Sequence, residues 1–119
     1  MAQNIEPQEL TSLNLAELSK QLLGKAKASS AKRAAQTIFG GRESILRHTL
    51  IAIAAGSELG EHDSPAEATL QVLLGNVVLK GKDREWNLNQ SDFIEIPPER
   101  HSVSAISDSV FLLTAIRSI

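Results

Sequence analysis

The sequence predicts a single all-β barrel preceded by a helical arm. Two observations favour this fold class: an amphipathic stretch with a helix start signal near the N-terminus and, from about residue 34, short apolar runs separated by turn residues at intervals of roughly 8 to 12 residues. A chain of 119 residues suits one core, because domains cluster around 100–150 residues. We expect the arm and a linker over residues 1–31 and the barrel over residues 32–119.

The helix is expected to begin after Asn14, which can cap it, while Glu17 three residues later can close a capping box. The apolar residues at helical spacing are Leu15, Leu18, Leu22 and Ala26. Gly24 weakens the middle of this helix or marks its end, and Lys27-Ala28-Ser29-Ser30 is interpreted as a linker. An isolated helix of this length is marginal in water, so its apolar stripe must dock on its own barrel or on a second subunit.

The strands are expected where apolar runs lie between turn residues. They are Thr37–Phe39, Leu46–Ala54, Thr69–Leu74, Val77–Leu79, Phe93–Ile96 and Val110–Ile116. Residues 50–55 and 110–113 are apolar at consecutive positions, which indicates that both faces of one sheet are covered, the outer face by the helix or by another subunit. Together with the docking requirement of the helix, this predicts a homodimer formed through barrel sheets.

The composition excludes several classes of function. There is no cysteine, so disulfides, thiolate nucleophiles and cysteine metal sites are ruled out. The formal net charge of -2 provides no basic field, and the lysines of the first third are interpreted as a solvated helix face, so we expect no nucleic-acid partner. No apolar run approaches the roughly 20 residues that span a bilayer, and the first ten residues lack a secretory pattern. A cytoplasmic protein without a membrane partner is expected.

Residues 56–75 contain a recognisable pattern, in which Gly56 precedes His62 and Gly75 closes the segment after the strand-end residues Val72-Leu73-Leu74. The order and spacing resemble the first motif of the cupin superfamily. Residues 91–101 resemble the second motif, which includes a proline and a histidine.

In that second segment Pro97 matches the family proline, and Ser91 and Glu99 stand where the family has glycines. His101 lies one residue closer to this proline than the family histidine does. The resemblance covers roughly Leu46 to Ile116. It implies a cupin-type barrel, a jelly-roll-like double-stranded β-helix, with the α-helical arm added at the N-terminus.

The resemblance also implies where a metal would bind. In metal-binding cupins the ligands are two histidines and a glutamate from the first motif and the histidine of the second. His62 and His101 occupy two of these four positions, whereas Ser64 and Ala68 occupy the other two. Serine and alanine cannot replace imidazole and carboxylate, so the metal site is expected to be incomplete and to hold no resident cofactor.

A divalent zinc, manganese, nickel or iron ion would need a substitute ligand. Glu67 and His48 are the candidates to join His62 and His101. Glu67 is adjacent to Ala68, so its side chain reaches the barrel interior only if a β-bulge intervenes. The face on which His48 lies is left open, because the odd-numbered and the even-numbered residues of its strand are both largely apolar.

A small-molecule site is expected at the barrel mouth. The candidate ligand-binding residues are His62, Ser64, Trp86 and His101. Trp86 shares strand parity with Leu88, which favours a core or pocket-wall position. Glu67 and Arg100 are interpreted as ion-pairing residues at the surface or barrel rim. Pro97-Pro98 is interpreted as a strand-end turn that positions His101.

These observations lead to a hypothesis of a small-ligand-binding cupin that lacks the full metal site. The alternative from the enzyme class is a metal-dependent cupin, dioxygenase- or isomerase-like, that uses His62, His101 and a non-standard third ligand. A second alternative is a regulatory or interaction module that acts through the N-terminal helix. No serine-hydrolase elbow, phosphate-binding loop, dinucleotide fingerprint or zinc-protease motif is present in the sequence.

Overall fold

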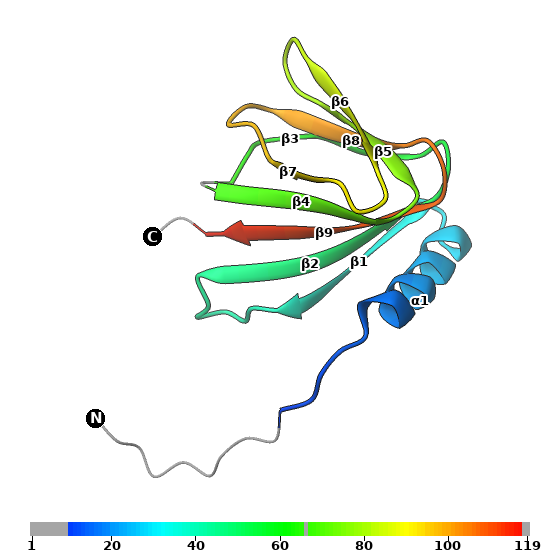
Figure 1. Cartoon of the computed structure of the whole chain (residues 1–119), viewed down its shortest axis with the longest axis vertical. Helices are drawn as coiled ribbons and strands as arrows, with labels where there is room; N and C mark the ends of the chain where they lie inside the picture. Colours follow the sequence, from blue (N-terminus) through cyan, green and yellow to red (C-terminus); the bar gives the residue numbers. More distant parts are fainter. Residues whose placement is uncertain (1–9, 66, 118–119) are drawn as a thin grey trace.

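The computed structural model describes residues 10–65 and 67–117, which form one helix and nine strands in two antiparallel sheets (Figure 1). The five-stranded sheet has the order β1-β2-β9-β4-β7 and the four-stranded sheet the order β3-β8-β5-β6. The elements are α1 (Leu15–Ala28), β1 (Arg33–Phe39), β2 (Leu46–Ile53), β3 (Glu58–His62), β4 (Glu67–Leu74), β5 (Asn76–Lys80), β6 (Glu85–Asn89), β7 (Phe93–Glu95), β8 (His101–Ala105) and β9 (Ser109–Ile116). The expected all-β fold with an N-terminal helix is confirmed.

Helix α1 begins where the sequence predicts, because the Asn14 side chain accepts a hydrogen bond from the Glu17 amide at 2.9 Å. Its C-terminal end differs from the prediction. Gly24 lies inside the helix, which continues to Ala28, so the first half of the expected linker is helical. Ser29 ends the helix, since its amide and its hydroxyl both donate to the Ala26 carbonyl.

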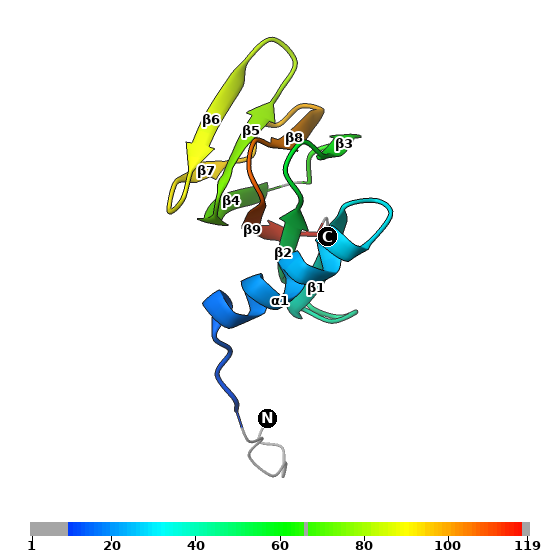
Figure 2. The same cartoon turned by 90° about the vertical axis from the view of Figure 1, so that its right-hand side faces the viewer.

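The apolar stripe of α1 docks on the outer face of the five-stranded sheet (Figures 1 and 2). Leu22 and Ala26 are buried there against Leu50, Ala52 and Val110. This contact explains why β2 and β9 are apolar on both faces, because their inner sides pack in the barrel core while their outer sides pack against the helix. The arm therefore docks on its own barrel.

Part of the same outer face remains uncovered by the helix. Strand pairing places Phe39, Leu46 and Phe93 on the same face of the five-stranded sheet as Leu50. Their side chains are 55%, 40% and 63% exposed, respectively. The docking of α1 accounts for both sequence arguments for a dimer, and these exposed residues are the observation that still favours one. The homodimer stays a prediction.

The barrel core lies between the inner faces of the two sheets, and alternate residues of β4, β5 and β8 are buried in it. Strands β3, β6 and β8 were not predicted. The sequence places Glu58 and Glu61 in a solvated loop, but the structure places them in β3, which pairs with β8. The segment Glu-Leu-Gly-Glu-His has little intrinsic strand preference, so the pairing with β8 decides its conformation.

Each of the other strands overlaps a predicted apolar run. The observed strand either extends one to four residues beyond an end of that run or ends one residue before it, a common difference for boundaries predicted from sequence. Within residues 10–65 and 67–117, no helix has the length and apolar character needed to cross a bilayer.

Candidate functional site

His62 and His101 lie opposite each other at the paired ends of β3 and β8. Their ring centroids are 4.3 Å apart and the ring planes are inclined by 64°, an edge-to-face arrangement. The pairing register shifts between Leu59 and His62, so a bulge brings His62 to the inner side that Leu59 and Val103 share. His101 is only 3% exposed, whereas His62 is half-buried. The structure thus brings together the two histidines that the sequence singles out.

Both imidazoles are oriented by backbone carbonyls. His62 Nδ1 lies 2.8 Å from the Gly60 oxygen, and His101 Nδ1 lies 3.0 Å from the Glu99 oxygen. A carbonyl oxygen only accepts hydrogen bonds, so Nδ1 is the protonated nitrogen in each ring, and Nε2 holds the lone pair of the neutral form. The pair therefore presents two hydrogen-bond acceptors.

Burial lowers the pKa of His101, and the neighbouring His62 lowers it further, against the opposing effect of the Glu99 carbonyl. His101 is accordingly neutral at neutral pH. A salt bridge outside the pair holds its strands together, because the Arg100 guanidinium binds Glu61 at 2.9 Å and Asp63 at 3.0 Å. Arg100 thus forms an ion pair at the surface as expected, but with Glu61 and Asp63 and not with Glu67.

The titration of His101 predicts a pH dependence of stability. Its pKa is lower in the folded state than the value of 6.5 it has when unfolded, so the unfolded chain binds a proton first as the pH falls. The stabilisation from His101 should be complete above pH 6.5 and be lost as the pH falls through the lower folded pKa. Urea unfolding at several pH values between 7.5 and 5, a window above the ordinary carboxylate pKa values, measures this loss.

His101→Gln is the control for that measurement, since it removes the titrating group. The fall in unfolding free energy between pH 7.5 and pH 5 should be smaller in this variant than in the parent. An equal fall in both proteins would show that other groups cause it.

The remaining metal-ligand positions of the motif contribute no ligand. Ala68 is packed in the barrel core, and the Ser64 hydroxyl donates to the Pro65 carbonyl at 3.1 Å. Within the described parts of the chain, no group of three or more His, Cys, Asp and Glu side chains could hold a metal ion. The residues therefore do not fit the metal centre that the family resemblance implies.

His48 and Glu67, the two candidates for a substitute metal ligand, lie apart from the histidine pair. The pairing of β4 with β9 runs without a shift from Glu67 to Val72, so no bulge turns Glu67 inward. His48 is hydrogen-bonded through Nδ1 to Thr114 Oγ1 at 3.0 Å, on the outer face of the sheet. Both side chains thus lie on the side away from the barrel interior.

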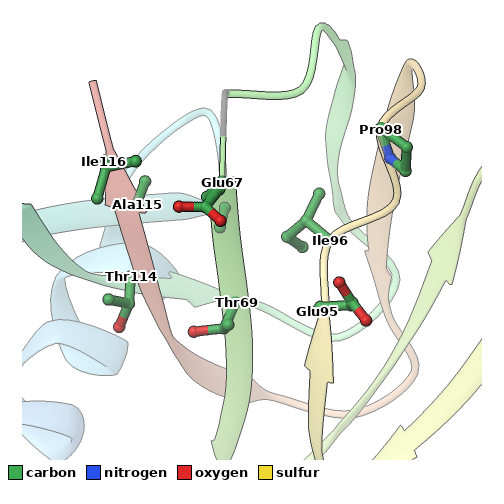
Figure 3. Close-up of a pocket in the computed structure, with 9 residues that line it drawn as sticks. Glu67, Thr69, Glu95, Ile96, Pro98, Thr114, Ala115 and Ile116 are labelled. Carbon is green, nitrogen blue, oxygen red and sulfur yellow. The ribbon is translucent and has the colours of Figure 1, made fainter. Parts of the chain in front are cut away.

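Glu67 instead lines a cavity of about 390 Å³ next to β4, β7 and β9 (Figure 3). Figure 3 shows Glu67 and Thr69 directed toward β9, where Thr114 and Ile116 lie. Neither His62 nor His101 lines this cavity. Glu67 therefore serves a different surface from the histidine pair.

Trp86 lies in β6, half-buried against the core, in agreement with a wall position. The Arg84 guanidinium stands 5.0 Å from the centre of its ring and binds the Glu99 carboxylate at 2.9 Å. Glu99 also accepts a hydrogen bond from the Lys82 amide at 2.7 Å. This bond, which has the larger effect, and the bond from Arg84 both lower the pKa of Glu99. A Cβ on Gly81 would collide with the same carboxylate.

This network was missed at the sequence level. The only available signal was Glu99 in place of a motif glycine; nothing in the sequence pointed to Arg84. Through its carbonyl and its carboxylate, Glu99 links His101 to Arg84 and so connects the histidine pair with the wall that contains Trp86.

Two antiparallel sheets that enclose one apolar core define this protein as a jelly-roll-type barrel. A cupin superfamily protein from Desulfitobacterium hafniense DCB-2 is similar in structure, with a TM-score of 0.73, 18% identity and 94% of both chains covered. A conserved protein of unknown function from Streptococcus pyogenes has a TM-score of 0.67 and 17% identity over 98% of this chain and 94% of its own.

The chain is also similar to a salicylate 1,2-dioxygenase from Pseudaminobacter salicylatoxidans, with a TM-score of 0.70 and 16% identity over 84% of this chain but 33% of the dioxygenase. No protein-family model and no curated protein sequence matches the chain. At these identities the likeness establishes the fold: the chain has the cupin fold, as its motifs indicated.

Proposed function

We propose that this protein binds a small polar molecule at His62 and His101 without the help of a metal ion. The observation that supports the proposal is the edge-to-face pair, in which a backbone carbonyl holds each Nδ1 and no described residue hydrogen-bonds to either Nε2. An imidazole in its neutral form accepts a hydrogen bond at Nε2, so the ligand class is a molecule with hydroxyl or amine donors. Preset ring orientations reduce the entropy lost on binding.

The two alternatives have less support. A metal-dependent enzyme needs a third ligand, and the two candidates, Glu67 and His48, lie on the outer face of the five-stranded sheet. An interaction module that uses the apolar stripe of α1 would have to release that stripe from the sheet, where Leu22 and Ala26 are 3% and 0% exposed.

NMR of the histidine rings tests the proposal. Small donors such as ethanolamine and glycerol should shift the ring resonances of His62 and His101 in a saturable way. His48 is an internal control, because it lies on the outer face and is bonded to Thr114. His62→Ala should abolish the effect at His101.

Two outcomes would contradict the proposal. Equal shifts of all three histidines would indicate a bulk effect of the solute, and saturable shifts that persist in His62→Ala would place the ligand elsewhere.

A further inference from the structure

A second groove lies at the seam of the barrel, where β6 and β7, each at the edge of its sheet, face one another (Figure 2). It has a volume of about 370 Å³, within the size range of small-molecule sites. Its lining residues are Arg84, Trp86, Ile94, Glu95, Ile96, Pro97 and Pro98. Neither histidine of the proposed site is among them, so the seam groove is a separate feature.

Five of the seven residues that line the seam groove are apolar, and several of them are held in place. Trp86 packs on the barrel core on one side, and the Arg84 guanidinium lies over its ring. Pro97 and Pro98 have fixed φ angles, and Ile96 is only 7% exposed. Rigid apolar and proline-lined walls favour a flat ring over a flexible chain, because a ring fills the space with little loss of conformational freedom.

The charges at the seam favour a cation over an anion. Arg84 is paired with Glu99 at 2.9 Å, so its charge is offset within the protein. Glu95 is exposed, and among residues 10–65 and 67–117 the ion pairs involve other carboxylates, those of Glu61, Asp63, Glu99 and Asp108. The net charge offered to a ligand at the seam groove is therefore negative.

We propose that the seam groove binds a small aromatic ammonium compound, with its ring between Trp86 and the two prolines and its ammonium group at Glu95. The ring is held by apolar and aromatic contacts, and the charge selects against aromatic acids of the same shape. This site is independent of the proposed function of the histidine pair.

Trp86 makes the test direct, because it is the only tryptophan and the chain has no tyrosine. Its fluorescence and its indole N–H resonance both report on the seam groove. Titrations at pH 7.5 with benzylammonium, benzyl alcohol and benzoate should give affinities that decrease in that order. We expect benzylammonium to bind about fivefold more tightly than benzoate, the effect of one exposed charge pair.

The role of the Glu95 carboxylate is tested by Glu95→Gln, with Glu67→Gln as the matched control. Glu95→Gln should bring the three affinities together, whereas Glu67→Gln, which makes the same change of charge on the neighbouring strand β4, should leave their order intact. His62→Ala should have no effect on any of the three.

The proposal is overturned if benzylammonium leaves the Trp86 signals unchanged, or if Glu95→Gln and Glu67→Gln act alike. Loss of binding in His62→Ala would move the ring site to the histidine pair and would also overturn it. If ethanolamine and glycerol did not shift the ring resonances of His62 and His101, the proposal for the seam groove would still stand, so the two proposals can fail separately.

Discussion

The double substitution Ser64→His, Ala68→Glu should raise the affinity for divalent cations by about a hundredfold or more, because it returns imidazole and carboxylate to the two incomplete positions of the motif. The structure meets two conditions for this result. His62 and His101 already converge, with 4.3 Å between their ring centres, and the Ala68 side chain points into the barrel. Isothermal titration with manganese, nickel and zinc measures the gain.

The same variant should become dependent on metal for its stability. An unpaired carboxylate at residue 68 is placed in an apolar core, where it costs several kcal/mol or becomes protonated. A metal that binds only the folded state offsets this loss in proportion to its occupancy. The melting temperature of the variant should therefore fall on chelation.

The parent protein and two simpler variants are the controls. The parent should purify with less than one equivalent of divalent metal, and chelation should hardly change its melting temperature. Ser64→His alone supplies one ligand, and Ala68→Gln tests the added bulk without the charge. A double variant that folds but binds no better than the parent would show that residue 64 or 68 does not reach the histidine pair.

Gly75→Ala should destabilise the protein by about 3 kcal/mol, the sum of a strained backbone and a disturbed hydrogen-bond network. Gly75 closes the first motif and has φ +75°, a left-handed conformation. A Cβ there would collide with the Asp108 carbonyl and the Ser109 hydroxyl. That hydroxyl donates to the Asn76 carbonyl at 3.0 Å, so it cannot move without losing this bond.

Gly24→Ala is the opposite case in the same chain. Gly24 lies inside α1 with open space around its Cα, so alanine should stabilise the protein by about 0.5–1 kcal/mol through helix propensity. Urea unfolding of both variants compares the two effects. A Gly75→Ala protein as stable as the parent would show that the turn relaxes without loss, and the motif glycine would then not be required by backbone geometry.

Features of this fold that depend on local signals could be predicted from the sequence. Asn14 and the leucine spacing located the start of α1, because a cap and an amphipathic stripe are properties of one segment. Apolar runs between turn residues located all strands of the five-stranded sheet, but only β5 of the four-stranded sheet. The motif order also indicated that His62 and His101 belong together, although they are far apart along the chain.

The direction in which several side chains face could not be predicted, because it depends on how the strands and the helix pack together. Both parities of the strand that contains His48 are apolar, so its orientation follows from pairing with β9 and from the docking of α1 on one side. Glu67 lies outside because the pairing of β4 has no bulge at that point. Strands β3, β6 and β8, which were not predicted, form by pairing with other strands, and the bond between Arg84 and Glu99 likewise joins residues from separate segments. These features depend on contacts between segments that are far apart in the sequence, so the residue pattern within one segment does not predict them.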